Sequence, residues 1–136
     1  MEIRENRVVI LGAGIGAMAM GFENASCKVV AAYEHDERAR DLYENNAKDK
    51  TYKIGELDYN NFEEIPDMDI LACDFRRGFS FTSAGMGKTY HFRNAVKAVV
   101  EFKQPKKVFF LVPCGYARLK PFKALLDYLK AEGYNY

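Results

Sequence analysis

The segment that most constrains the fold is an apolar run at residues 8–11 that leads directly into Gly12-Ala13-Gly14-Ile15-Gly16. An apolar run followed by a glycine-rich turn and a helical stretch is typical of the first strand and helix of a parallel sheet. Glycine lets the chain turn sharply and approach a ligand closely, and the first N–H groups of the helix can bind polar or anionic groups. The segment therefore predicts a nucleotide or nucleoside site.

Similar apolar runs recur at residues 29–33, 68–73 and 108–112, and stretches with helical periodicity lie between them. This alternation predicts an α/β fold, a doubly wound and mostly parallel sheet with helices on both faces. With 136 residues, the chain is expected to form a single domain, 1–136. The expected helices are 15–24, 37–47, 92–102 and 121–132, with a short strand at 52–54 and loops at 58–66 and 76–88.

The acidic residue Glu34 ends the second apolar run, about twenty residues after the glycine turn. A carboxylate at this place accepts hydrogen bonds from both hydroxyls of a ribose. Strand, turn, helix, strand and acid therefore follow one another in the order that a nucleoside site needs. This order fits the NAD or FAD site of an oxidoreductase as well as an S-adenosylmethionine site, so this part of the chain leaves both open.

The wider string from Ala13 to Glu23 resembles motif I of the cytosine-C5 DNA methyltransferases, which typically reads A-G-I-G-G-F-x-L-G-F-E. Glu34-His35-Asp36 resembles the second motif of that family, and Gly55-Glu56-Leu57 resembles the third. Residues 67–71, 79–80, 104–110 and 122–136 extend the resemblance over nearly the whole chain. The resemblance implies a domain that binds S-adenosylmethionine or S-adenosylhomocysteine. The implied cofactor contacts are Gly12, Gly14, Gly16, Met18, Glu34 at the ribose, His35 on the adenine and Glu56 at the adenine amino group.

Two catalytic motifs of that family are replaced. The family attacks carbon 6 of cytosine with a Cys thiolate from Pro-Cys-Gln and holds the ring with a Glu from Glu-Asn-Val. In this chain Arg76 or Arg77 stands at the place of the nucleophile, and arginine is no nucleophile. Leu111-Val112-Pro113 replaces the second motif and contains no acid. The resemblance thus implies a chain that is inactive by itself, either a pseudoenzyme or one part of a split methyltransferase of a restriction-modification system.

No other cysteine is a convincing nucleophile. Cys73 lies within an apolar run, where a cysteine is usually a small buried hydrophobic residue. Cys114 lies in the region where RNA cytosine-C5 methyltransferases carry their nucleophile, but no matching acid follows it. The three cysteines and two histidines show no spacing typical of a metal site.

The charge balance limits the expected partners. With 20 basic and 19 acidic residues the formal net charge is +1, too small for bulk electrostatic binding of nucleic acid. A local DNA contact is expected near Arg76 and Arg77. The alternative, which is commoner for charged loop residues, is that both side chains are simply solvated. The family's final strands are absent, so the exposed sheet edge predicts a complementary methyltransferase chain or a homo-oligomer. The charged N-terminus and the short apolar runs predict a cytoplasmic protein without membrane contact.

Two other functions compete with this interpretation. The first is an NAD- or FAD-type dinucleotide-binding domain of an oxidoreductase, which would share the glycine turn and Glu34. The second is a noncatalytic interaction protein with a vestigial pocket. Gly12 favours the second, because the resembling family carries at this place an aromatic residue that packs on the cofactor.

Overall fold

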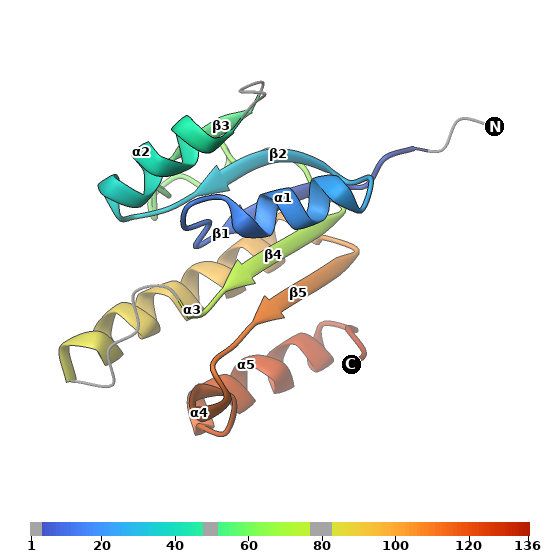
Figure 1. The fold of residues 1–136 in the computed structure, drawn as a ribbon. Helices are drawn as coiled ribbons and strands as arrows, with labels where there is room; N and C mark the ends of the chain where they lie inside the picture. The colour runs from blue at the N-terminus through green and yellow to red at the C-terminus, as the bar shows by residue number, and fades with distance from the viewer. Residues whose placement is uncertain (1–3, 48–51, 77–82) are drawn as a thin grey trace.

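The computed structural model describes residues 4–47, 52–76 and 83–136, and these residues contain a parallel sheet with strand order β3-β2-β1-β4-β5 (Figure 1). All four neighbouring pairs of strands run parallel. The predicted α/β fold is therefore confirmed, including the short strand that the sequence placed near residue 53. The strands are β1 (Arg7–Leu11), β2 (Lys28–Tyr33), β3 (Lys53–Gly55), β4 (Ile70–Asp74) and β5 (Lys107–Leu111).

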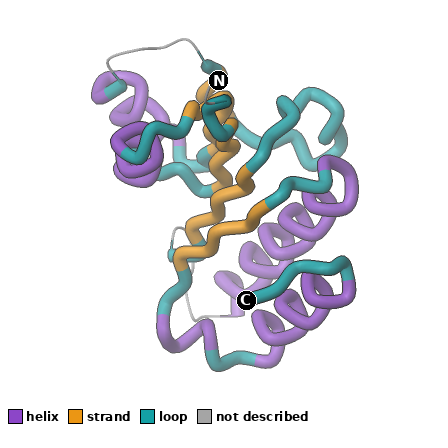
Figure 2. Tube along the Cα trace, turned by 90° about the vertical axis from the view of Figure 1, so that its right-hand side faces the viewer, coloured by secondary structure: helices purple, strands orange, loops and turns teal. Residues whose placement is uncertain are grey.

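Helices cover both faces of this sheet, as the view along its edge shows (Figure 2). The helices α1 (Ala17–Asn24) and α2 (Glu37–Asn46) lie on one face. The opposite face carries α3 (Ser83–Lys103) and α5 (Lys120–Ala131), and the single-turn α4 (Cys114–Ala117) precedes α5.

The expected loop at 76–88 was wrong from Ser83 onward, because α3 already begins there. Gly85 and Gly87 disfavour a helix through their backbone entropy, which is why this stretch was assigned to a loop. The later turns of α3 bury Ala95, Val96 and Val99 against the sheet. Extending an existing helix costs far less than nucleating one, so the packed part sustains the weak first turns.

Alternate residues of the central strands enter two separate hydrophobic cores. In β1, Val8 and Ile10 pack under α1 and α2, whereas Val9 and Leu11 pack under α3 and α5. All five residues of β4 are buried. Continuous apolar strands are expected where both faces of a parallel sheet are covered, which explains why the sequence revealed these strands clearly.

Asp69 fastens the amino ends of three strands. Its carboxylate accepts a hydrogen bond from the Arg7 N–H at 3.0 Å and pairs with Lys106 Nζ at 3.0 Å. Its main-chain oxygen accepts a hydrogen bond from the Lys107 N–H at 3.0 Å. The Arg7 hydrogen bond and then Lys106 lower the pKa of Asp69 below its ordinary value. The ends of β1, β4 and β5 opposite the glycine turn are thereby held together.

Within the described ranges, the helices include none with the length and apolar character needed to cross a membrane.

Candidate functional site

The glycine turn closes over the carboxyl end of β2. Gly12, Gly14 and Gly16 all have positive φ angles, of 74°, 60° and 102°, which other residues adopt only with strain. The N–H groups of Gly12 and Ala13 both donate to the Tyr33 main-chain oxygen, at 2.9 and 3.0 Å. The turn is therefore fixed to the strand that ends just before Glu34.

The fold itself accounts for two of these glycines, by close packing at Gly12 and by backbone conformation at Gly16. A Cβ atom on Gly12 would lie 2.8 Å from the main-chain oxygen of Asp74 at the end of β4, and a Cβ on Gly16 would lie 3.4 Å from the Tyr43 ring in α2. The Phe92 ring of α3 also comes within 3.6 Å of the Gly12 Cβ position. Packing thus requires glycine at Gly12, and the positive φ favours glycine at Gly16, whatever the turn binds.

Glu34 is the buried anchor of the turn. Its side chain is fully buried, and its Oε2 atom accepts a hydrogen bond from the Gly14 N–H at 2.7 Å. Its Oε1 atom accepts the Asp36 N–H at 3.0 Å and lies 3.2 Å from His35 Nδ1. A carboxylate offers about four lone-pair directions, so most of its capacity is already used. The ribose hydroxyls expected at Glu34 would have to compete with these donors.

Most of the predicted cofactor contacts gather at one end of the sheet. The Glu34 N–H donates to the Gly55 main-chain oxygen at 2.9 Å, which brings the end of β3 beside the end of β2. His35 and Glu56 follow these two strands, and both are exposed. Met18 differs, because its side chain is half-buried and packs against the core beneath α1. The contact roles of all seven residues remain predictions.

This cluster also has a stable local framework. Asp36 caps α2, because its Oδ1 atom accepts hydrogen bonds from the N–H groups of Arg38 and Ala39 at 3.0 and 3.4 Å. Arg40 of the same helix donates from Nη1 to the Glu34 main-chain oxygen at 2.7 Å. The backbone that carries Glu34 and His35 is therefore tied to both β3 and α2.

At the catalytic-loop position, Arg76 forms a salt bridge with Asp74. Arg76 donates from Nε to Asp74 Oδ1 at 3.1 Å and from Nη2 to Asp74 Oδ2 at 2.9 Å. The Arg76 N–H also donates to Oδ1 at 2.8 Å. The Asp74 side chain is nearly buried, whereas that of Arg76 is about half exposed. Asp74 raises the pKa of Arg76, so the guanidinium stays charged. Arg77, Phe79 and Ser80 lie outside the described residues.

Cys73 in β4 is completely buried. Burial, followed by the nearby charge of Asp74, raises the pKa of its thiol well above the ordinary value, so it carries no thiolate near neutral pH. Cys114 is exposed at the first residue of α4, after Val112 and Pro113. The expectation that Cys73 is a buried hydrophobic residue is confirmed.

The sequence did not reveal an aromatic cluster around Phe75. This residue lies between Asp74 and Arg76 in the sequence. Phe75 is fully buried, and its ring meets those of Phe92 at 5.0 Å and Phe110 at 5.2 Å, both edge to face. Tyr116 and Phe122 also contact it, each with a centroid distance of 5.7 Å. Edge-to-face aromatic pairs are favourable, so this cluster fixes the chain immediately before Arg76.

Two sizeable cavities formed by described residues do not include the acidic and histidine side chains of the predicted cofactor site. One, of about 930 Å³, runs beside α1 and α2 and is lined by Gly16, Met20 and Tyr43 among others. The other, of about 760 Å³, lies between β5 and the C-terminal residues. Neither of these two is lined by Glu34, His35 or Glu56. Among the described residues, no group of three or more His, Cys, Asp and Glu side chains could hold a metal ion.

The strand order, with the glycine turn and the acid after β2, defines a Rossmann-like domain. The family model of the C-5 cytosine-specific DNA methylases matches residues 7–111. The chain therefore belongs to the C-5 cytosine-specific DNA methylase family, as the sequence motifs predicted.

Curated relatives agree with this assignment, and a solved structure shares the fold. The chain is 34% identical to the type II methyltransferase M.HaeII of Haemophilus aegyptius, over 98% of this chain and 43% of the relative. It is also 34% identical to M.BsuFI of Bacillus subtilis, over 92% of this chain and 32% of the relative. The S. pombe Dnmt2 methyltransferase shares the fold, with a TM-score of 0.73 and 17% identity over 97% of this chain and 42% of that one. The chain thus spans less than half the length of these relatives.

Proposed function

We propose that this chain binds S-adenosylmethionine or S-adenosylhomocysteine and does not methylate DNA by itself. It would act as a pseudoenzyme or as one part of a split methyltransferase in a restriction-modification system. One observation carries the proposal. In a chain of this family, the glycine turn, Glu34, His35 and Glu56 share one end of the sheet, and at that same end the catalytic-loop position holds Arg76 paired with Asp74.

The residues fit a nucleoside in chemical type, provided that the turn can move. Glu34 would accept the ribose hydroxyls once the Gly14 N–H releases it, His35 would pack on the adenine, and Glu56 would accept from the adenine amino group. Gly12, Gly14 and Gly16 would shape the turn beside the cofactor, with Met18 behind it. When bound, S-adenosylmethionine supplies an electrophilic methyl group.

The residues at the reacting positions support the inactive assignment. Attack on carbon 6 of cytosine requires a thiolate, and the half-exposed Arg76 cannot provide one. The Cys73 thiol is buried and has a raised pKa. Val112 and Pro113, where the family carries its acid, have no carboxylate to hold the base. Restoring a nucleophile at residue 76 would therefore still leave the chain without an acid to hold the base.

Calorimetric titration of the full chain with S-adenosylmethionine, S-adenosylhomocysteine and NADH tests the cofactor. We expect heat and a higher melting temperature with the first two ligands and none with NADH, whose binding would instead favour the oxidoreductase alternative. Glu56→Gln should weaken binding about tenfold, because a neutral amide oxygen accepts a weaker hydrogen bond than a carboxylate does. Glu44→Gln, at an exposed position of α2, is the matched control and should change nothing.

Transfer of radiolabelled methyl groups to duplex DNA tests the missing activity. We expect no incorporation by the unmodified chain, and none by the variant Arg76→Cys, because no acid stands at residues 111–113. Methylation of DNA by the unmodified chain alone would overturn the inactive assignment. Incorporation only after Arg76→Cys would show that the nucleophile alone was missing.

We also propose a local DNA contact at Arg76. Its guanidinium is half exposed, but Asp74 neutralises part of its charge, so the contact should be weak. In fluorescence anisotropy with a duplex, Arg76→Ala should reduce both the affinity and the salt dependence, since one phosphate contact is lost. Arg38→Ala, at an exposed position of α2, should alter neither. Equal effects of the two variants would exclude a specific role for Arg76.

One observation favours a second candidate, a noncatalytic interaction protein with a vestigial pocket. The Glu34 carboxylate is fully buried and already accepts the Gly14 N–H, an arrangement that serves the fold without any ligand. A folded chain that shows neither heat nor a thermal shift with S-adenosylmethionine would support this candidate over the first.

We propose further that residues 1–136 form one domain. Both hydrophobic cores flank the same sheet, and β1 and β4 contribute residues to each core. Heat unfolding should therefore occur in a single transition, with circular dichroism and calorimetry giving the same midpoint.

A further inference from the structure

The strand order reverses between β1 and β4. The strands β2 and β3 lie on one side of β1, whereas β4 and β5 lie on the other. The helices that follow these two strands, α1 and α3, lie on opposite faces of the sheet (Figure 1). Open α/β sheets bind their ligands beyond the carboxyl ends of the strands at such a point. A bound ligand is therefore expected next to the residues that follow Leu11 and Cys73, which pair in the sheet.

Asp74 brings a nearly buried carboxylate to this point. Its neighbours Cys73 and Phe75 both pack into the core under α3 and α5. Because side chains alternate along a strand, the Asp74 side chain points to the opposite face, which carries α1. The Asp74 main-chain oxygen lies 2.8 Å from the place of a Cβ atom on Gly12. The glycine turn therefore packs directly against the residue that carries this carboxylate.

The salt bridge between Asp74 and Arg76 leaves hydrogen-bonding capacity of both kinds. Among the described residues, Asp74 Oδ1 accepts the Arg76 main-chain N–H and Nε, at 2.8 and 3.1 Å, whereas Oδ2 accepts only Nη2, at 2.9 Å. A carboxylate oxygen can accept more than one hydrogen bond, so Oδ2 has capacity left. The guanidinium likewise has N–H groups beyond those that Asp74 uses. They are accessible, because the Arg76 side chain is 56% exposed.

The chain between the two residues fixes their positions. Phe75 is fully buried and packs against Phe92 and Phe110 at centroid distances of 5.0 and 5.2 Å. Its main-chain N–H donates to the Leu111 oxygen at 2.8 Å. Groups that are already fixed before binding lose little conformational freedom when a ligand arrives. Hydrogen bonds from this pair should therefore contribute to affinity with little loss to ordering.

The charges of the pair cancel, which restricts the class of ligand. A phosphate group, whether of DNA or of a dinucleotide, would be attracted by Arg76 but repelled by the Asp74 carboxylate beside it. A zwitterion is attracted by both, since its cation can approach Asp74 while its anion accepts hydrogen bonds from Arg76. The α-amino acid group of S-adenosylmethionine and S-adenosylhomocysteine is such a zwitterion near neutral pH. The pyrophosphate of NAD is not.

The distance from the adenosine end fits such a ligand. Glu34, the predicted ribose contact, follows β2, and Asp74 ends β4, with β1 between these strands. Two strand spacings amount to about 10 Å. The ribose and the amino acid chain of S-adenosylmethionine can together bridge this span across the glycine turn.

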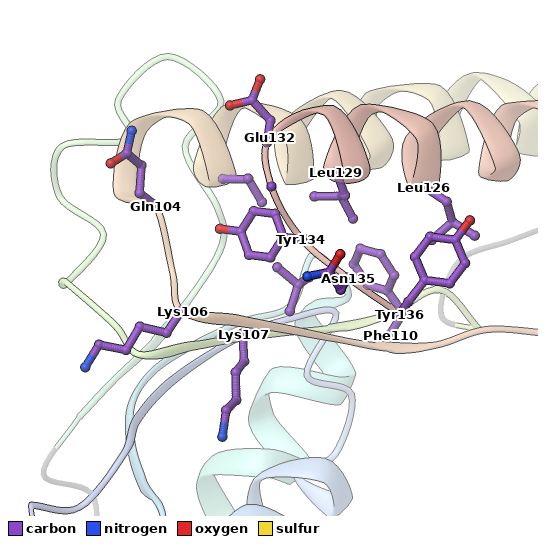
Figure 3. Close-up of a pocket in the computed structure, with 13 residues that line it drawn as sticks. Gln104, Lys106, Lys107, Phe110, Leu126, Leu129, Glu132, Tyr134, Asn135 and Tyr136 are labelled. Atoms are coloured by element: carbon purple, nitrogen blue, oxygen red, sulfur yellow. The ribbon is translucent and has the colours of Figure 1, made fainter.

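The cavity of about 760 Å³ is not an alternative place for the amino acid group. Figure 3 shows Phe110, Leu126 and Leu129 pointing into it, and these side chains belong to the core under α3 and α5 or pack against it. Ala13 of the glycine turn packs in the core on the opposite face. A ligand that lies on the turn therefore extends toward Asp74 and not into this cavity.

We propose that Asp74 and Arg76 bind the amino acid end of the cofactor. Arg76 donates to the α-carboxylate, and Asp74 Oδ2 accepts from the α-ammonium group. This inference rests on the proposed cofactor function. It makes the pair a determinant of specificity, which selects ligands that combine adenosine with a free amino acid. The family's Pro-Cys-Gln motif contains neither an acid nor an arginine, so the contact is a property of this chain's own sequence.

Calorimetric titration of the full chain with S-adenosylhomocysteine and 5′-methylthioadenosine tests the proposal. The second ligand keeps the adenosine and the sulfur but lacks the amino acid group. We expect the natural chain to bind S-adenosylhomocysteine at least about tenfold more tightly, because only this ligand makes charge-assisted hydrogen bonds with the pair. Arg76→Ala should lose most of this preference, with weaker binding of S-adenosylhomocysteine and unchanged binding of 5′-methylthioadenosine. Arg76→Lys, which keeps the charge but not the guanidinium geometry, should fall between.

Arg38→Ala, at an exposed position of α2, is the matched control and should keep the full preference. Unchanged binding of 5′-methylthioadenosine, together with a melting curve, verifies that each variant is folded. Equal affinity of the natural chain for the two ligands would overturn this inference and leave the proposed cofactor function standing. An equal loss for both ligands in the folded Arg76 variants would do the same. If neither ligand binds the natural chain, the proposed function fails and this inference fails with it.

Discussion

Substituting Gly12 by alanine separates the structural role of the glycine turn from its role in binding. At this position φ is +74°, and an added Cβ would lie 2.8 Å from the main-chain oxygen of Asp74. That oxygen belongs to β4, which is buried along its whole length, so it cannot move aside without shifting a central strand. The variant must therefore either strain the turn or push β1 and β4 apart.

The magnitude follows from two contributions. Placing a residue with a side chain in the left-handed region costs about 1–2 kcal/mol. Forcing an extra carbon into a well-packed site costs about 1–3 kcal/mol more. The total of roughly 2–5 kcal/mol is a large part of the 5–15 kcal/mol by which a typical domain is stable. At about 4 °C per kcal/mol for a chain of this size, Gly12→Ala should melt roughly 8–20 °C lower than the natural chain.

Gly21→Ala provides the matched control. Gly21 lies within α1, and a Cβ there would meet nothing within 4 Å. Alanine is about 0.5–1 kcal/mol better than glycine inside a helix, so this variant should melt slightly higher than the natural chain. Circular dichroism melts without ligand measure both. If Gly12→Ala melts like the natural chain, the contact with the Asp74 oxygen is not rigid, and the structural explanation of Gly12 is refuted.

Three other predictions concern buried and paired groups. Iodoacetamide should modify the exposed Cys114 in the folded chain and leave Cys73 unmodified, because Cys73 is buried and burial raises the pKa of its thiol. Peptide mass spectrometry measures this, and alkylated Cys73 in the folded chain would contradict it. Asp69→Asn should lower the melting temperature at neutral pH. Because the folded pKa of Asp69 is lowered, its contribution exists above the unfolded pKa of about 3.9 and is lost as pH falls through the lower folded value. The two chains should therefore converge in acid, and a constant difference would exclude the carboxylate as the cause. Glu34→Gln should destabilise the fold by about 2 kcal/mol, because a buried charge-assisted network loses an acceptor. The control Glu44→Gln, at an exposed position, should not change the stability. Equal melting temperatures for the two variants would argue against the Gly14 contact.

The sequence predicted the strands and most of the helix boundaries well, but it missed the start of α3. Residues 8–11 and 29–33 lie in strands covered on both faces, and such strands leave continuous apolar runs that need no tertiary information. The start of α3 depends on packing by Val96 and Val99, more than ten residues further along the chain, against the local preference of Gly85 and Gly87. Local propensity could not reveal it.

The candidate site was predicted where its signals are local. The glycine turn and Glu34 follow strands directly, so the motif order alone located them. The Phe92 ring beside Gly12 and the aromatic cluster around Phe75 involve residues far apart in the sequence, which no spacing rule connects. Asp74 was overlooked for another reason: its spacing from Arg76 indicates no particular contact, and only the geometry shows the two-point pairing.

The network around Asp69 has a consequence for how this chain can evolve. Its contacts with Arg7, Lys106 and Lys107 hold the strand ends that lie opposite the glycine turn. Residues at the other end, such as Arg76 and Val112, can therefore change without loosening that network. In this design, substitutions at the end of the sheet that carries the glycine turn leave the fastening at the opposite end intact, so the two ends can vary independently.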